Sequence, residues 1–288
     1  MFWPWKNKRN ATGPQETLET AAENEPIACL LSDVGCHREL NEDSARIVRA
    51  SADGHVDRGL LVVVADGMGG HQAGEVASQA AVETVGKEYS TLRGTPGEAL
   101  EKAFRRAHQA ILKLAQDNPA LAGMGTTCTA VAIVGRQAWA AHVGDSRLYL
   151  VRGREIYQLS EDHTHCMEMV RNGLMTLEEA KRHEDRNVVI RAMGTRPELA
   201  LMTWPKPMTV KPRDIFVLCS DGLHDLVSDA EIREAVWDTN PSLACPKLVK
   251  MARDRGGYDN ITLAVVAIPS ADSAPVALKE TRQYEVNR

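Results

Sequence analysis

The feature that most constrains this chain is a short apolar run that ends abruptly on a carboxylate. Residues 60–65 read Leu-Leu-Val-Val-Val-Ala and lead directly into Asp66-Gly67-Met68-Gly69-Gly70-His71. A β-branched, fully apolar run of this length predicts a buried strand. An unpaired carboxylate at its end would be costly unless it finds a partner or is neutralised, and the glycines let backbone or a ligand approach closely. Asp66 therefore either binds a cation or only caps the turn that follows the strand.

The same pattern recurs along the chain. Four further motifs place an acidic residue at an end of an apolar run: Asn41-Glu42-Asp43, Gly144-Asp145-Ser146-Arg147, Ser220-Asp221-Gly222 and Asp259-Asn260. Turn chemistry alone does not account for five acidic positions placed in this way. We therefore expect these side chains to converge on one site.

Composition excludes several classes of function. The 288 residues, 43% hydrophobic and 25% charged, suit one large soluble globular domain or two small ones. A net charge of −5 gives no basic field for nucleic acid. No apolar run reaches the ~18–20 residues of a membrane span, and the N-terminus lacks a signal-peptide core. The six cysteines are scattered without zinc or redox spacing, which favours a reducing, cytoplasmic setting.

Hydrophobic periodicity and turn residues predict an α+β fold. We expect a flexible N-terminal leader over residues 1–25, a domain over 26–269 and a loose C-terminal tail over 270–288. Helices are predicted over 74–89 and, after the capping box Thr95-Pro96-Gly97-Glu98, to about residue 117. Two further helices are predicted after Ser228 and over 242–253, outside the sheets.

The strands suggest two antiparallel sheets packed face to face, a central β-sandwich flanked by helices on both outer faces. Short links join four predicted strands, 126–134, 138–143, 148–151 and 155–159, and predict that each pairs with the next. A polar segment over 161–187 interrupts the sheet, and we interpret it as a helical flap beside the acidic site.

The chemistry follows if Glu42, Asp66, Asp221 and Asp259 share one site. Two carboxylates ~4 Å apart repel by about 4 kcal/mol at an effective dielectric constant near 20, so the group needs protons or cations. Oxygen ligands without His or Cys select Mg²⁺ or Mn²⁺. Bridging carboxylates suggest two ions that activate a shared water for attack on a phosphoryl group. Arg38 is close in sequence and suits the phosphate oxygens.

In their order, these motifs resemble the metal-dependent serine/threonine protein phosphatases, the PPM or type 2C family, and in particular its compact bacterial branch. The residues that carry the resemblance are Arg38, Asn41-Glu42-Asp43, Asp66-Gly67-Met68-Gly69-Gly70-His71, Gly125-Thr126-Thr127, Gly144-Asp145-Ser146-Arg147, Ser220-Asp221-Gly222 and Asp259-Asn260. The match covers about residues 27–268. Each motif alone is weak, whereas the ordered set is specific.

The resemblance implies a role for each matching residue. Asp66 would bridge two Mg²⁺ or Mn²⁺ ions, with the Gly67 carbonyl and Glu42 on one ion and with Asp221 and Asp259 on the other. Asp145 would join Asp221 at a third ion, Asp43 and Asn260 would support the ligands, and Arg38 would hold the phosphate. The implied activity is hydrolysis of phosphoserine and phosphothreonine on proteins by direct attack of a metal-bridging water. The implied partners are phosphoproteins targeted by a cognate Ser/Thr kinase in bacterial signalling, and we expect a monomer.

One position departs from the family pattern. Some members carry a histidine directly after the Asp-Gly pair, where it is proposed to protonate the leaving oxygen, but this chain has Met68 there. His71 either takes part or only shapes the turn. His163 and His165 are expected to be solvated or packed, and His142 to be an ordinary strand residue.

Two other functions remain open on the sequence. A catalytically silent relative could act as a binding module, although such a protein would be expected to lose metal carboxylates. Another two-metal hydrolase, such as a phosphodiesterase or nuclease, would share the ligands, but the acidic balance and the absence of base-stacking aromatics near the motifs argue against it.

Overall fold

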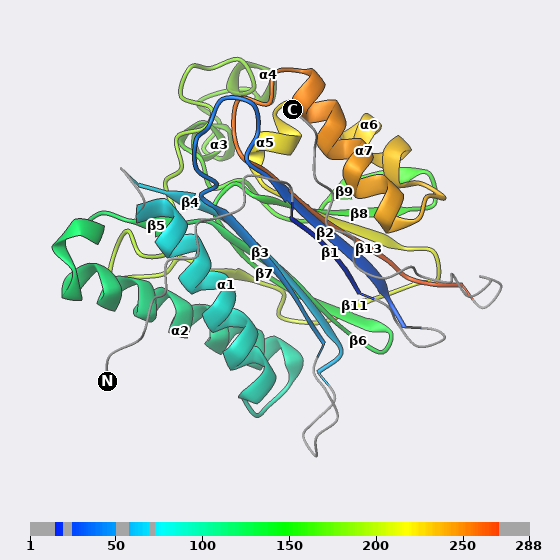
Figure 1. The fold of residues 1–288 in the computed structure, drawn as a ribbon, viewed down its shortest axis with the longest axis horizontal. Helices are drawn as coiled ribbons and strands as arrows, with labels where there is room; N and C mark the ends of the chain where they lie inside the picture. The colour runs from blue at the N-terminus through cyan, green and yellow to red at the C-terminus, as the bar shows by residue number, and fades with distance from the viewer. Residues whose placement is uncertain (1–14, 20–24, 50–57, 70–72, 271–288) are drawn as a thin grey trace.

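The computed structural model describes residues 15–19, 25–49, 58–69 and 73–270, and its strands form two antiparallel sheets (Figure 1). The first sheet has, in spatial order, β1 (Gln15–Glu19), β2 (Ile27–Asp33), β13 (Ile261–Ala267), β12 (Ile215–Cys219), β8 (Arg147–Arg152) and β9 (Glu155–Gln158). The second has β10 (Met202–Thr203), β7 (Gln137–Val143), β6 (Cys128–Val134), β4 (Leu60–Met68) and β3 (Asp43–Arg49), with β11 (Met208–Thr209) beside β7 and β5 (Gly125–Thr126) beside β4.

The apolar run that opens the sequence analysis is β4, which is buried on both of its faces. Because side chains alternate along a strand, Leu60, Val62 and Val64 pack into the core between the two sheets. Leu61 and Val63 point the other way, into a core formed with helices. Burial on both faces explains why β4 is apolar throughout rather than alternating.

Helices cover the outer face of each sheet, as Figure 1 shows. The second sheet is covered by α1 (Ala73–Thr91) and α2 (Pro96–Asp117), and the first by α6 (Asp229–Val236) and α7 (Pro241–Asp254). The predicted capping box begins α2, since Thr95 N donates to Glu98 Oε2 at 2.9 Å and Glu98 N donates to Thr95 Oγ1 at 3.3 Å. The predicted α+β sandwich is confirmed.

The expected pairing of consecutive strands is wrong at one link. β6 pairs with β7 and β8 pairs with β9, but β7 and β8 lie in different sheets. The link over 144–146 instead carries the chain from one sheet to the other. Gly144 allows this with φ +111°, and a Cβ there would lie 2.5 Å from the Cβ of Thr127. The short link therefore makes a crossing between the sheets rather than a hairpin.

The remaining elements are short. The segment predicted as a flap holds α3 (His165–Arg171) and α4 (Leu177–Ala180), while η1 (Pro119–Leu121) follows α2 and α5 (Asp221–His224) follows β12. A bridge between Thr164 and Val189 closes the base of the flap. Neither α5 nor β1 was expected from the sequence, and β1, inside the segment expected to be a flexible leader, instead pairs with β2. Among the described residues, no helix is long and apolar enough to cross a membrane.

The core under α2 can be tested with one pair of substitutions. Phe104 is fully buried, whereas Leu114 on the same helix is 39% exposed. We expect Phe104→Ala to lower the free energy of unfolding by about 3–5 kcal/mol, because it leaves a cavity, and Leu114→Ala to lower it by less than about 1 kcal/mol. Urea unfolding followed by circular dichroism measures both, and equal losses would contradict the packing described.

Candidate metal centre

The acidic residues predicted to converge lie at one end of the sandwich, on both of its sheets. Asp66 lies near the C-terminal end of β4 in one sheet, and Asp43 lies directly across from it on β3. Asp221 follows β12 in the other sheet, and Asp259 precedes β13 there. Burial is the main cause that raises the pKa of Asp66 well above its ordinary value, and the charges of Asp43, Asp221, Asp145 and Asp259 add to it. The structure thus brings these carboxylates within electrostatic reach of one another.

The carboxyl groups of Asp66 and Asp221 approach each other: burial is the main cause that raises the pKa of Asp221, and the side chain of Asp66 partly opposes that rise. Two carboxylates can touch only when a proton or a cation lies between or beside them. The Oδ1 atom of Asp221 is buried and has no hydrogen-bond partner, which is a costly state for a charged oxygen. A dication bound beside Asp221 would satisfy this oxygen and would offset the repulsion between the two carboxyl groups.

Burial raises the pKa of the neighbouring carboxylates in the same way. Burial raises the pKa of Asp145 to about 7, with the Asp221 charge adding to the effect. Burial likewise raises the pKa of Asp43 to about 7, although Ser220 Oγ donates to Asp43 Oδ2 at 2.7 Å and favours the charged form. The donors are all oxygens, the set preferred by Mg²⁺ and Mn²⁺.

The acidic residues suit a metal ion in their negative charge and in their oxygen donors. Within the part of the chain that the structure describes, no three His, Cys, Asp or Glu side chains form a ready metal-binding group.

Glu42 and Gly67 are held against the start of α1. Gly67 N donates to the Glu42 carbonyl at 3.1 Å, and the Glu42 carboxylate accepts a hydrogen bond from the backbone of Gly74. A Cβ at Gly67 would lie 2.2 Å from the Gly74 carbonyl oxygen and 2.5 Å from that of Glu42. Only glycine fits at Gly67, so the Asp-Gly motif reflects close approach of three backbone segments.

Asn260 joins the segment before β3 to the segment before β13. Its Oδ1 accepts from Glu42 N at 2.8 Å, and its Nδ2 donates to the carbonyls of Val34 and Leu40, both at 2.9 Å. All the hydrogen-bonding atoms of this buried amide are therefore used to fix the loop that carries Arg38 and Glu42.

Arg38 lies beside the carboxylates and is paired with one of them. Its guanidinium donates to Asp259 Oδ2 at 2.7 Å, and its side chain is 48% exposed. The Glu42 and Asp221 charges also favour its charged form and help to raise its pKa against the effect of burial. Arg38 is thus near enough to the site to meet a phosphate there, with its charge partly satisfied by Asp259.

The two threonines of the Gly125-Thr126-Thr127 motif bond the backbone of Asp66. Thr127 Oγ1 accepts from Asp66 N at 2.9 Å and bonds Ser146 Oγ at 2.7 Å, while Thr126 Oγ1 donates to the Asp66 carbonyl at 2.8 Å. These contacts tie the end of β4 to the crossing that carries Asp145. This motif, one of those that carry the family resemblance, therefore supports the backbone at the site.

Two histidines whose rings lie close together in a tilted arrangement pack behind the crossing. His142 lies on β7, as expected, and its ring is 4.9 Å from that of His163. His163 Nδ1 accepts from Gly144 N at 3.1 Å, and His163 N donates to the Gly144 carbonyl at 2.8 Å. His163 is therefore packed, whereas His165 is exposed at the start of α3.

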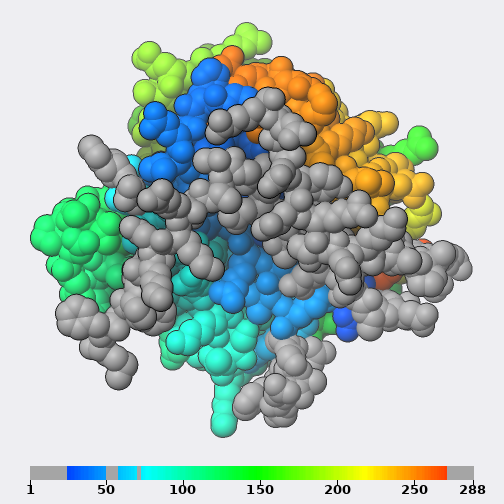
Figure 2. Space-filling model, viewed as in Figure 1, coloured from blue at the N-terminus to red at the C-terminus, as the bar shows by residue number. Residues whose placement is uncertain are grey.

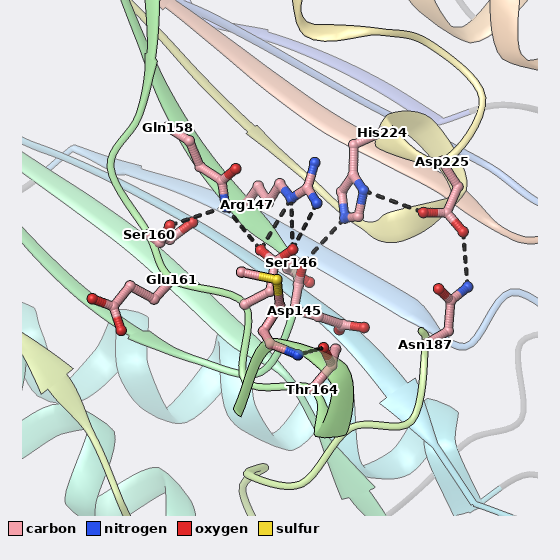
Figure 3. A network of polar contacts seen from close by, with 12 residues as sticks. Asp145, Ser146, Arg147, Gln158, Ser160, Glu161, Thr164, Asn187, His224 and Asp225 are labelled. Carbon is pink, nitrogen blue, oxygen red and sulfur yellow. Dashed lines mark hydrogen bonds and ion pairs between the residues drawn. The ribbon is translucent and has the colours of Figure 1, made fainter. Parts of the chain in front are cut away.

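Sequence reasoning missed His224, which lies in the helical turn begun by Asp221 (Figure 3). Its Nε2 is 3.1 Å from the Asp145 carbonyl oxygen, and its Nδ1 is 3.5 Å from Asp225 Oδ1. Asn187, from the end of the flap segment, donates to Asp225 Oδ2 at 2.8 Å. Burial would raise the pKa of Asp225, but the contacts with His224 and Asn187 outweigh it and lower the pKa to about 2.

The signal for His224 was present in the sequence Asp221-Gly222-Leu223-His224-Asp225, in which one helical turn would set a histidine three residues after a candidate ligand. Recognising it required the short helix α5, which the sequence analysis did not predict.

A comparison with known families decides the membership of the chain. The profile of the family described as protein phosphatase 2C matches residues 38–246, well over half of the sequence. The chain belongs to the protein phosphatase 2C family. The resemblance drawn from the ordered motifs is confirmed.

Individual members of the protein phosphatase 2C family are similar to this chain over most of its length. The protein phosphatase PhpP of Streptococcus pneumoniae is 37% identical over 253 residues, which span 85% of this chain and 98% of PhpP. The crystal structure of the Mycobacterium tuberculosis serine/threonine phosphatase PstP has a TM-score of 0.76 at 34% identity and covers 85% of this chain and 99% of that one. A structure of the PstP catalytic domain with two manganese ions has a TM-score of 0.72, with the same identity and coverage.

The position directly after the Asp-Gly pair holds no proton donor. Met68, the last residue of β4, cannot donate a proton, and His71 lies outside the described residues.

The packing of His163 predicts how stability depends on pH. Burial and the neighbouring His142 lower the pKa of His163 to about 3, and protonating Nδ1 would break its bond from Gly144 N. The unfolded chain therefore takes up this proton more readily than the folded one. The contribution of His163 to the free energy of unfolding is therefore fully present above about pH 6.5 and is lost as the pH drops toward 3. At pH 5 the loss from this group is roughly 2 kcal/mol.

The substitution His163→Asn, whose Oδ1 can still accept from Gly144 N, should make the free energy of unfolding fall less steeply between pH 6.5 and 5. The exposed His165→Asn serves as the control and should keep the wild-type slope. Urea unfolding at several pH values measures both, and a wild-type slope in His163→Asn would contradict the assignment.

Proposed function

We propose that this member of the protein phosphatase 2C family is an Mg²⁺- or Mn²⁺-dependent protein phosphatase that hydrolyses phosphoserine and phosphothreonine on proteins. The observation that carries the proposal is the buried approach of Asp66 and Asp221, because a cation there would offset their repulsion and would satisfy the unpartnered Oδ1 of Asp221. The PhpP and PstP relatives are named as protein or serine/threonine phosphatases, and PstP binds two manganese ions.

In this proposal the ligands divide between two ions. Asp66 would bridge them, the Gly67 carbonyl and Glu42 would hold one, and Asp221 and Asp259 would hold the other. Asp145 with Asp221 would provide a third site, which the raised pKa of Asp145 beside Asp221 supports. Bound dications would neutralise the carboxylates and make the attacking water a stronger nucleophile.

The surrounding side chains would hold these groups and the substrate. Asp43 and Asn260 would act as positioning residues, Asp43 through Ser220 and Asn260 through the loop before β3. Arg38 would bind the phosphate oxygens, since a guanidinium presents two parallel donors to a phosphate. Because Met68 has no proton to give, the leaving oxygen would take its proton from solvent ordered at the site.

The wider assignments are part of the same proposal. The phosphatase domain would span residues 26–269, with the flap over 161–187 beside the site and residues 1–25 and 270–288 as leader and tail. The protein would act as a monomer in the cytoplasm on phosphoproteins made by a cognate Ser/Thr kinase in bacterial signalling.

Removing the metal ions or one of their ligands should abolish phosphate release. We expect chelation by EDTA, or the substitution Asp221→Asn, to lower kcat/KM for a phosphothreonine peptide about 100-fold or more, because several kcal/mol of transition-state stabilisation is lost. Asp254→Asn, an exposed carboxylate paired with Lys250 on α7, is the matched control and should retain activity.

Calorimetry with Mn²⁺ gives a second readout, in which Asp221→Asn should lose a binding event that Asp254→Asn keeps. Undiminished turnover after chelation would overturn the proposal. Equal turnover of a phosphate diester and a monoester would favour the phosphodiesterase alternative instead.

Replacing Arg38 tests phosphate binding separately from metal binding. We expect Arg38→Ala to lower kcat/KM about 10–100-fold, because a charge-assisted bidentate contact contributes about 1.5–3 kcal/mol, while Mn²⁺ binding persists. Arg38→Lys should recover only part of the loss, since a lysine cannot make the paired contact. Steady-state kinetics with inorganic phosphate as a competitive inhibitor measures the effect, and unchanged phosphate inhibition in Arg38→Ala would contradict the role.

A further inference from the structure

Two exposed rings stand next to the residues assigned to the phosphate and the metal. The ring of His37 stacks on that of Tyr258, with centroids 5.2 Å apart and planes inclined by 25°. Tyr258 is 63% exposed, and His37 is exposed as well. We name this pair the ring shelf. No role described above uses it.

The ring shelf is not required to hold its two loops together. Cys36 N donates to the Gly257 carbonyl at 2.7 Å, directly before the two rings in the chain. Directly after them, Arg38 pairs with Asp259 at 2.7 Å. The amide of Asn260 also bonds the loop before β3 at both of its ends. In the space-filling view the blue surface between β2 and β3 borders the orange surface of α7 (Figure 2).

The position of the ring shelf relates it to the substrate. His37 precedes Arg38 and Tyr258 precedes Asp259, so each ring starts from a Cα about 3.8 Å from that of its neighbour. A phosphoryl group bound at Arg38 would lie beside the same two loops. In an extended peptide the next residue lies about 3.3–3.6 Å further along, which brings its side chain within reach of the rings.

We propose that the ring shelf receives a ring side chain, aromatic or proline, that flanks the phosphorylated residue of a protein substrate. This inference rests on the proposed phosphatase function and adds a determinant of specificity to it. Stacked aromatic rings favour a further flat apolar group, packed offset or edge-on. A basic flanking side chain is disfavoured because Arg38 already places a positive charge beside the shelf.

The test compares phosphothreonine peptides that differ only next to the phosphorylated residue. One set carries Phe and the other Ala, on the N-terminal or the C-terminal side in separate peptides. Phosphate release gives kcat and KM for the wild type, Tyr258→Ala and Tyr258→Phe. Tyr157→Ala is the matched control, because Tyr157 is 49% exposed on β9 and takes no part in the site.

We expect the wild type to prefer the Phe peptide on one side. In Tyr258→Ala, kcat/KM for that peptide should fall about 5–10-fold, the scale of one aromatic contact, mainly through KM, so that the preference over Ala disappears. Tyr258→Phe keeps the ring and should keep the preference, as should Tyr157→Ala. Calorimetry with Mn²⁺ should show the same metal binding in Tyr258→Ala as in the wild type.

The failures of the two ideas can be told apart. A wild type that hydrolyses the peptides without a Phe preference, or a Tyr258→Ala variant that keeps the preference, would overturn the ring shelf and leave the phosphatase function standing. A wild type that releases no phosphate from any peptide with Mn²⁺ present would overturn the proposed function and the shelf with it.

Discussion

The meeting of Asp66 and Asp221 is the interaction on which the rest of the site depends. Each residue comes from the end of a buried strand in a different sheet, so the contact exists only because the two sheets pack face to face. Two carboxyl groups held this way repel each other unless positive charge or a proton is supplied. The fold therefore holds the acidic groups in a position that is unfavourable for them alone and favourable with a dication.

The supporting residues show how that position is maintained. Hydrogen bonds fix the surroundings of three carboxylates: Thr127 bonds the backbone of Asp66, Asn260 bonds that of Glu42, and Ser220 bonds the carboxylate of Asp43. A fully bonded polar network in a buried place specifies one arrangement, because each missing bond would leave a costly unpaired atom. The packed core of the sandwich keeps the strands rigid, and these hydrogen bonds fix the carboxylates relative to the strands.

Much of this was predictable from the sequence, for identifiable reasons. The apolar run of β4 and the capping box before α2 are local signals, because a continuous apolar stretch and hydrogen bonds within four residues can be recognised without knowing distant parts of the chain. The crossing between β7 and β8 was not predictable from link length, because a glycine with positive φ serves a hairpin and a crossing equally well. The place of His224 depends on a contact with Asp145, and that of the adjoining Asp225 on a contact with Asn187, both of which are remote in sequence.

The crossing over 144–146 also determines which parts of the molecule can be altered without harm. Because β7 runs into it and β8 runs out of it, the turns at Gly135 and Gly153 lie a full strand length away from the carboxylates. A Cβ at either glycine would meet nothing within 4 Å, so the turns face open space, but the glycines themselves have φ of +55° and +63° and should be kept. These two turns are therefore suitable places to attach a fluorophore or to graft an affinity peptide, so that the enzyme could be tethered or tracked with its acidic end unobstructed.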